Sequence, residues 1–272
     1  MKTVAIQGYE GSFHQLAARN YFGNDIQTVA CATFREVARK LRESEVDYAV
    51  MAIENSIAGS IIANYSILQN HDLQVEGEVY LLIRQNLMAL PGQKLEDIKE
   101  VQSHPMALLQ CVDFLDKHPW RLVESEDTAL SAQKISEGKI MGTAAIAGDL
   151  PAELFGLEIL APEINTIKNN ATRFMVLKRR DNVIENGVNK ASLYFKINND
   201  HGALLKVLEA TEVANVNMTK LQSYPIPSDP WHYLFHIDLE FSALEDYNKV
   251  VKEMREQASE IYIYGVYKKG EK

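Results

Sequence analysis

Six consecutive residues in the second half of the chain combine side chains that could bind a carboxylate and supply a proton. Residues 169–174 contain two amides, a hydroxyl, a guanidinium and an aromatic ring, and the apolar run 175–177 follows them. A polar opening before an apolar, β-branched run predicts the start of a strand. Arg173 could hold a carboxylate in a bidentate fork while the hydroxyl of Thr172 supplies a proton nearby. A strand start with a surface arginine is the plainer interpretation of the hexapeptide alone.

Further polar residues lie where predicted strands lead into predicted helices. Asn55 and Ser56 follow the buried run 48–53, and the side-chain amide of Asn55 is placed to reach a ligand. As plain caps, these two residues would need no ligand. Ser103 is expected to cap a helix that reaches about residue 118, and its spacing of seven from Gln110 puts both on one face.

These residues need elements that bring them together. Strands and helices alternate from residue 3 to 177, which predicts a three-layer α/β domain with a mainly parallel sheet. We expect two lobes, residues 1–78 with 165–180 and residues 79–164. A cleft between them would gather Asn55, Ser103, Gln110 and Thr172, because ligands bind such sheets at the carboxyl ends of the strands.

Two shorter segments carry further expectations about this domain. Ser12 follows a glycine turn and fits a helix N-cap, and amides at such a helix start favour an anion. The run 142–147 consists largely of small residues and is expected to begin a helix whose surface allows close approach of another backbone.

The pattern changes after a polar linker at residues 181–190. Residues 191–272 are expected to form strands at 191–197, 218–224, 233–241 and 261–267, with helices at 203–213 and 244–258. The resulting order, βαββαβ, is that of a ferredoxin-like module.

Composition narrows the class of protein. The 272 residues are 46% hydrophobic and 24% charged, which is typical of a globular protein long enough for two domains. A formal charge of −9 argues against general binding to nucleic acid or to an anionic membrane surface, although not against an anionic small molecule. Cys31 and Cys111 have no metal-ligand spacing and are expected to be free thiols. With no N-terminal signal pattern and no long apolar run, we expect a cytoplasmic protein.

Taken together, the motifs resemble the prephenate dehydratase family, with a regulatory ACT domain behind the catalytic domain. The resemblance covers nearly the whole chain and rests on Gly8-Tyr9-Glu10-Gly11-Ser12-Phe13, Ile53-Glu54-Asn55-Ser56 with Gly59, Ser103-His104-Pro105 with Gln110-Cys111, Asp127-Thr128-Ala129, Ala144-Ala145-Ile146-Ala147 and Asn170 with Thr172-Arg173-Phe174. The family fold resembles a type-2 periplasmic binding protein, which agrees with the two lobes expected from the pattern.

The resemblance implies a reaction without a cofactor in phenylalanine biosynthesis. Prephenate loses its ring hydroxyl, and its ring carboxylate as carbon dioxide, and becomes phenylpyruvate. The catalytic threonine of the family falls on Thr172, whose hydroxyl would donate to the leaving oxygen, and Arg173 would anchor a carboxylate. Helix starts near Ser12 and Ser56 would support the anion. The remaining residues implied in substrate binding are Asn55, Ser56, Ser103, Gln110, Asn170 and Phe174.

The C-terminal module matches the family in one motif and departs from it in another. Gly202-Ala203-Leu204-Leu205 matches the first phenylalanine-binding motif, which implies L-phenylalanine as an effector. The second motif, Glu-Ser-Arg-Pro in the family, stands here as Gln222-Ser223-Tyr224-Pro225 and lacks a carboxylate and a guanidinium. An ACT domain that serves assembly alone is therefore the alternative. ACT modules pair, so a homodimer or homotetramer is implied.

Other classes of function lead to different expectations. A non-catalytic sensor of an aromatic amino acid or its precursor would bind its ligand without turnover. A transport-type solute-binding protein is disfavoured by the absence of a signal pattern. A fused chorismate mutase is not expected, since no long helical segment precedes the first strand.

Overall fold

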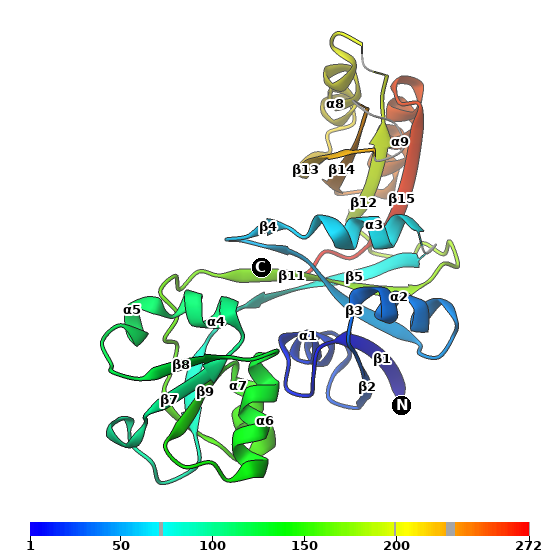
Figure 1. Cartoon of the computed structure of the whole chain (residues 1–272). Helices are drawn as coiled ribbons and strands as arrows, with labels where there is room; N and C mark the ends of the chain where they lie inside the picture. The colour runs from blue at the N-terminus through cyan, green and yellow to red at the C-terminus, as the bar shows by residue number, and fades with distance from the viewer. Residues whose placement is uncertain (71–72, 199, 227–231, 272) are drawn as a thin grey trace.

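Three β-sheets organise the chain in the computed structural model, which describes residues 1–70, 73–198, 200–226 and 232–271. Helices pack on each sheet, and the third sheet stands on the first, away from the second (Figure 1). The predicted α/β class is confirmed. The prediction of a mainly parallel sheet is wrong, because the first and second sheets both mix strand directions.

The first sheet has the order β2-β1-β3-β11-β5, with β4 paired to β3. β1 is parallel to β2 and β3, whereas β11 runs antiparallel to both of its neighbours. The direction of β11 is reversed because the chain re-enters this sheet from the second one. Its elements are β1 (Lys2–Gln7), α1 (Phe13–Phe22), β2 (Ile26–Cys31), α2 (Phe34–Arg42), β3 (Tyr48–Asn55), β4 (Gly59–Ser60), α3 (Ile62–Asn70), β5 (Leu73–Leu82) and β11 (Ala171–Arg179).

The second sheet has the order β10-β6-β9-β7-β8. β7 is parallel to β8 and β9, and β6 is antiparallel to β9 and β10. Its elements are β6 (Asn86–Ala89), the 3-10 helix η1 (Leu95–Asp97), β7 (Glu100–Ser103), α4 (Pro105–Gln110), α5 (Val112–Leu115), β8 (Arg121–Glu124), α6 (Thr128–Gly138), β9 (Thr143–Ala147), α7 (Asp149–Phe155) and β10 (Glu158–Ala161).

Two segments connect the first and second sheets, and they bind to each other. β5 stays in the first sheet as far as Leu82, opposite Ala171, so the crossing lies later than the predicted boundary at residue 78. The N–H of Ile83 donates to the carbonyl of Asn170 at 2.7 Å, and the N–H of Ile164 donates to that of Gln85 at 2.7 Å. The crossing is therefore a hydrogen-bonded pair of chains.

Two sequence expectations about helices in the second sheet fail. The small-residue run does not begin a helix: Ala144 to Ala147 form the fully buried centre of β9, and α7 begins only at Asp149. Alanine favours helices, but a central strand buried on both faces favours small apolar residues, and the tertiary position decides. The helix expected from Ser103 is two short helices, and its N-cap is His104, whose Nδ1 accepts from the N–H of Met106.

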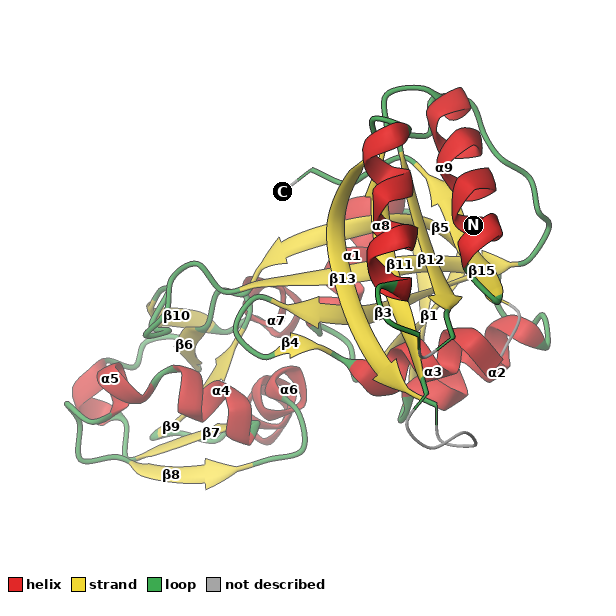
Figure 2. Cartoon of the chain, turned by 90° about the horizontal axis from the view of Figure 1, so that it is seen from above, coloured by secondary structure: helices red, strands yellow, loops and turns green. Residues whose placement is uncertain are grey.

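The third sheet is antiparallel, with the order β13-β14-β12-β15. The element order is the predicted βαββαβ, with β12 (Lys190–Lys196), α8 (Ala203–Val213), β13 (Asn217–Pro225), β14 (Tyr233–Glu240), α9 (Leu244–Gln257) and β15 (Glu260–Tyr267). Both helices cover one face of this sheet (Figure 2). Phe195 and Ile237 lie in that core, whereas Tyr194 and Tyr264 face the other way and pack in one cluster with Tyr65.

No helix in the described part of the chain combines the length and the apolar composition needed to cross a membrane.

Candidate active site

A cleft of about 340 Å³ lies between the first and second sheets. The first sheet contributes Asn55 from the end of β3 and Thr172 and Phe174 from β11, and the second contributes Gln110 from α4 and Thr128 from α6. Ends of strands and starts of helices thus meet at one place. This is the cleft that the sequence predicted, and it gathers three of the four residues expected there.

The hydroxyl of Thr172 is oriented by Asn55, which lies directly opposite it in the ladder between β3 and β11. Nδ2 of Asn55 donates to Oγ1 of Thr172 at 2.9 Å. Rotation of the amide by 180° would break two hydrogen bonds, because its Oδ1 already accepts the N–H groups of Ile57 and Ala58 at 3.0 and 2.9 Å. Thr172 therefore accepts from Asn55, and its own O–H has no acceptor within the described residues. That proton is available to a ligand in the cleft.

Asn170 lies beside this pair and is almost fully buried. Its Oδ1 accepts from Nδ2 of Asn55 at 2.6 Å. Its Nδ2 has no hydrogen-bond partner among the residues that the structure describes. Asn170 lines a smaller apolar pocket of about 210 Å³, and Asn55 and Gln110 line both this pocket and the cleft. The two hollows therefore share the amides of Asn55 and Gln110.

Gln110 and Gln85 meet across the second side of the cleft. Nε2 of Gln85 donates to Oε1 of Gln110 at 3.3 Å. Oε1 of Gln85 is buried and has no partner in the described ranges, so it can accept from a ligand. Gln85 lies in the crossing segment between β5 and β6 and belongs to no sequence motif, so it was not predicted. Gln110 takes the position that the sequence predicted.

Arg173 lies on the opposite face of β11 from Thr172, because successive side chains of a strand alternate. Its guanidinium contacts Glu78, Asp238 and Tyr267 and lines a hollow between the first and third sheets. It does not line the cleft. The structure thus does not place Arg173 where it could anchor a carboxylate beside Thr172. Phe174, the next residue on the cleft face, does line the cleft and packs edge-on against His14.

Two predicted serines also lie away from the cleft lining. Ser103 is fully buried at the end of β7, where its hydroxyl donates to the carbonyl of Ile146 at 2.6 Å. Ser56 lies in the turn between β3 and β4 rather than at a helix start, and its hydroxyl accepts the N–H of Ala171 at 2.9 Å. These contacts hold the strands that carry the site and leave neither hydroxyl in the cleft.

His14 is a cleft residue that the sequence analysis did not single out. Its Nε2 accepts the N–H of Ala52 at 3.3 Å, and its ring packs between Phe34 and Phe174. Burial lowers the pKa of His14 to about 4, so the ring is neutral near pH 7 and carries its proton on Nδ1. His14 follows Ser12 in the glycine-turn motif, which was the only sequence clue to its position.

Two helix starts and two acidic residues complete the cleft. Ser12 caps α1 and Asp127 caps α6, and both line the cleft. Burial raises the pKa of the Asp127 carboxyl, partly offset by backbone N–H groups that bind it. Glu126 also lines the cleft, whereas no lysine or arginine does so among the described residues. The groups that this lining offers a negative ligand are amides, hydroxyls, the imidazoles of His14 and His104 and the helix N-termini.

A separate pocket of about 240 Å³ opens in the C-terminal unit, and we call it the C-terminal pocket. All four residues of the Gly202-Ala203-Leu204-Leu205 motif line it, and Gly202 has the left-handed φ of 77° that glycine accepts readily. The remaining walls are Ile197, Asn198, Asp200, His232, Tyr233 and Phe235. Gln222 and Ser223 are not part of this lining and lie on β13 at the edge of the sheet.

Comparison with known proteins assigns a family to this arrangement. The family model described as prephenate dehydratase matches residues 4–182. A relative from Arabidopsis thaliana, named arogenate dehydratase/prephenate dehydratase 1, chloroplastic, is 35% identical, with 97% of this chain and 71% of that protein covered.

Solved structures share the whole architecture. The structure titled "GqqA- a novel type of quorum quenching acylases" is 30% identical, has a TM-score of 0.88 and covers 98% of both chains. Prephenate dehydratase from Arthrobacter aurescens in complex with L-Phe is 28% identical, has a TM-score of 0.85 and covers 98% of this chain and 89% of that one. The matches to named dehydratases define the class of protein as a carbon–oxygen lyase. Within that class, the chain belongs to the prephenate dehydratase family.

Proposed function

We propose that the cleft is an active site that converts prephenate into phenylpyruvate without a cofactor. The observation that carries the proposal is the hydrogen bond from Nδ2 of Asn55 to Oγ1 of Thr172, since it leaves the threonine proton for a ligand. The cleft also offers neutral donors and acceptors on its other side, at Gln85 and Gln110. A substrate with a leaving hydroxyl fits this set of groups.

The reaction needs help mainly at the leaving oxygen. As the ring carboxylate departs as carbon dioxide, the electrons of the broken C–C bond enter the ring and the C–O bond breaks. The departing hydroxide takes up one proton and leaves as water. Thr172 would donate the hydrogen bond, or the proton, that neutralises the developing charge. A threonine hydroxyl is a weak acid, so its orientation by Asn55 supplies much of its effect.

We infer that the substrate carboxylates are held by uncharged groups. The N-terminus of α1 at Ser12 and that of α6 at Thr128 border the cleft. Aligned peptide dipoles there are equivalent to about half a positive charge at each helix start. The amides of Asn55, Gln110 and Asn170 would orient the substrate, and Phe174 would shape the wall beside its ring.

We further propose that residues 1–180 form a two-lobed catalytic domain of the type-2 periplasmic-binding-protein kind, and that residues 191–272 form a regulatory ACT domain. Support comes from the cleft between two sheets and from the βαββαβ order of the third unit. The C-terminal pocket would bind L-phenylalanine, because its apolar walls suit an aromatic side chain and the amides at the start of α8 suit a carboxylate.

The assembly and the compartment are part of the same proposal. ACT units pair, and β13 is an edge strand from which Gln222 and Ser223 would reach a second copy in a homodimer or homotetramer. Light scattering from the purified protein tests this directly. We propose a cytoplasmic location, which agrees with Cys31 and Cys111 as free, buried thiols.

Turnover of prephenate by the purified protein, without metal or nucleotide, tests the proposed reaction. We expect Thr172→Ala to lower kcat by about a hundredfold or more, the scale of a lost acid or oxyanion donor. Thr172→Val keeps the side-chain volume and should keep substrate affinity, whereas Thr172→Ser keeps the hydroxyl and should keep most of the activity. The measurement is phenylpyruvate formation together with calorimetric binding of prephenate.

Two results would contradict the proposal in different ways. Near-normal kinetics in Thr172→Ala would remove this hydroxyl from the mechanism. Binding of prephenate to the folded wild-type protein without any turnover would favour a sensor that recognises the precursor of an aromatic amino acid.

A further inference from the structure

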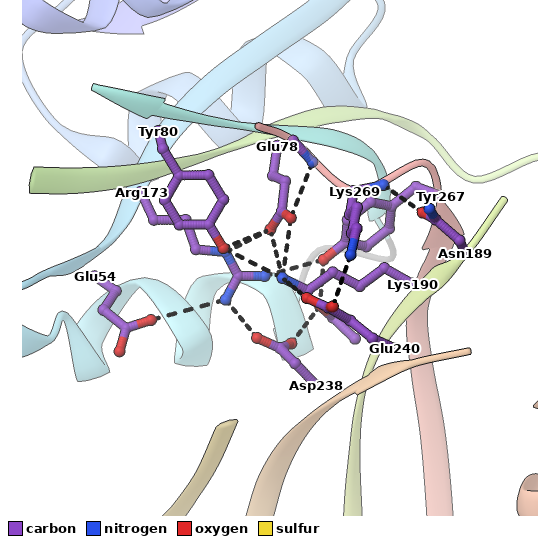
Figure 3. Close-up of polar contacts among 12 residues, drawn as sticks. Glu54, Glu78, Tyr80, Arg173, Asn189, Lys190, Asp238, Glu240, Tyr267 and Lys269 are labelled. Atoms are coloured by element: carbon purple, nitrogen blue, oxygen red, sulfur yellow. Dashed lines mark hydrogen bonds and ion pairs between the residues drawn. The ribbon is translucent and has the colours of Figure 1, made fainter. Parts of the chain in front are cut away.

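A buried network of charged side chains joins β11 to the third sheet (Figure 3). The first sheet contributes Arg173 and Glu78, and the third contributes Lys190 and Asp238. Their exposed fractions are 4%, 3%, 1% and 2%, in that order. Separated charges at such burial would be costly, so the four groups depend on one another.

Arg173 is the centre of the network and uses all sides of its guanidinium. Nε donates to Oε2 of Glu78 at 2.7 Å, Nη1 is ion-paired with Asp238, and Nη2 donates to the hydroxyl of Tyr267 at 3.0 Å. Nζ of Lys190 lies 2.9 Å from Oε1 of Glu78 and thereby closes the network from the other side. Three of these four links cross from the first sheet to the third: those of Arg173 to Asp238 and to Tyr267, and that of Lys190 to Glu78.

Arg173 and Thr172 are neighbours on β11 and point to opposite faces of it. The ladder with β3 shifts register opposite these residues, because β3 carries one extra residue there, Ile53. β11 itself is regular, since its ladder with β5 has no shift through this stretch. In a regular strand neighbouring side chains keep opposite directions, so a rotation of the strand that moves the Arg173 guanidinium also turns the Thr172 hydroxyl relative to Asn55.

The same third-sheet strands reach the C-terminal pocket. β14 carries Phe235 in the wall of that pocket and Asp238 three residues further along. β12 carries Ser192, whose hydroxyl donates to Asp238, and its end leads directly to Ile197 in the pocket wall. A change at the pocket can therefore reach Asp238 along continuous, paired strands.

We propose that the ion pair between Arg173 and Asp238 couples occupancy of the C-terminal pocket to the position of Thr172. Arg173 is then a positioning residue for the catalytic hydroxyl and does not anchor the substrate. The part that concerns regulation rests on the proposed phenylalanine effector, whereas the part that concerns Thr172 stands on the catalytic cleft alone. Because a buried pair is either formed or broken, the coupling is a switch between two arrangements.

Asp238→Asn tests the proposal, because it removes the charge and keeps the shape and the acceptor for Ser192. We expect kcat to fall by about tenfold to a hundredfold while KM for prephenate stays within about twofold, as for a misplaced donor. We also expect calorimetry to show unchanged L-phenylalanine binding while phenylalanine no longer alters kcat. Glu260→Gln is the matched control, since it removes an ion pair with Lys196 inside the third sheet and should change neither quantity.

Arg173→Lys separates positioning from anchoring. A positioning role predicts a lower kcat at constant KM, and a raised KM at constant kcat would overturn the proposal. An equal phenylalanine response in Asp238→Asn and wild type would also overturn the coupling. A wild type that binds no phenylalanine would refute the proposed effector and leave the kcat measurement as the test of positioning. If Asp238→Asn does not fold, Ser192→Ala loosens the same carboxylate without a charge change and should produce a smaller effect of the same kind.

Discussion

At the scale of single residues, the orientation of one amide decides what Thr172 can do. Asn55 is fixed by two backbone N–H groups on its oxygen, so its NH₂ group faces the threonine. An aspartate at this position would still accept both N–H groups. It would, however, accept the proton of Thr172 instead of donating to its oxygen, and the hydroxyl would point away from the substrate.

We therefore expect Asn55→Asp to lower kcat by about a hundredfold, close to the loss in Thr172→Ala, while the turn at Ile57 and Ala58 persists. Asn55→Ala should cost less activity, since the threonine proton stays free although its orientation is lost. Steady-state kinetics with thermal denaturation of each variant measures the two effects separately. A ranking in which alanine is the more damaging substitution would exclude the orienting role.

At the scale of elements, close approach between β15 and β5 determines how the third sheet sits on the first. Gly265 lies where a Cβ atom would stand 2.1 Å from the carbonyl oxygen of Val75. No rotamer change relieves that contact, because the obstacle is backbone. Glycine is required here because the two backbones lie so close together, and the side chain of any other residue would push the two strands apart.

We expect Gly265→Ala to lower the free energy of unfolding by about 1–3 kcal/mol, the usual cost of overpacking, and to lower kcat through the displaced Arg173. Gly138→Ala is the control, since a Cβ there meets only the side chain of Ile140 and alanine favours the helix α6. Urea unfolding of both variants gives the comparison. Equal stability of Gly265→Ala and wild type would show that the sheets can separate at little cost.

The sequence predicted elements better than it predicted their partners. The strand that carries Thr172 and Arg173 was expected, and its alternation alone could have placed the two side chains on opposite faces. The mixed sheets could not be predicted in this way, because strand direction depends on where the chain re-enters a sheet. The small residues of the fully buried β9 predict a helix from sequence alone, since such residues fit both a helix and a central strand.

For the candidate site residues too, local motifs were predictive and contacts between distant segments were not. The motifs correctly predicted three residues that line the cleft, Thr172, Asn55 and Gln110. The hydroxyl of Ser103, by contrast, is already hydrogen-bonded to the carbonyl of Ile146, 43 residues away in the sequence. Gln85 could not be found, because its role comes from the crossing of two chain segments. Contacts distant in sequence thus account for both kinds of miss.

At the scale of the whole molecule, β11 is the common wall of two interfaces. One face borders the cleft, and the other meets the third sheet through Arg173 and an aromatic cluster that contains Tyr65, Tyr264 and His236. His236 is buried, with Nδ1 bonded to the hydroxyl of Tyr264 at 3.0 Å and no partner for Nε2 in the described ranges. Burial, reinforced by the charge of Lys220, lowers the pKa of His236 to about 4.

This shift links the interface to pH. Below its ordinary pKa of 6.5, His236 binds a proton in the unfolded chain but not in the folded one until the pH nears 4. The unfolded state thus binds more protons in this window, and stability falls as the pH is lowered, by about 1.4 kcal/mol per pH unit and about 3 kcal/mol in all. We expect His236→Phe, which cannot titrate, to reduce the slope of the unfolding free energy between pH 6.5 and 4 by about 1.4 kcal/mol per pH unit and to leave the contribution of His14, whose pKa burial also lowers to about 4. Tyr264→Phe is the control, because it keeps the histidine and should keep the slope. Parallel curves for wild type and His236→Phe would show that the acid sensitivity arises elsewhere.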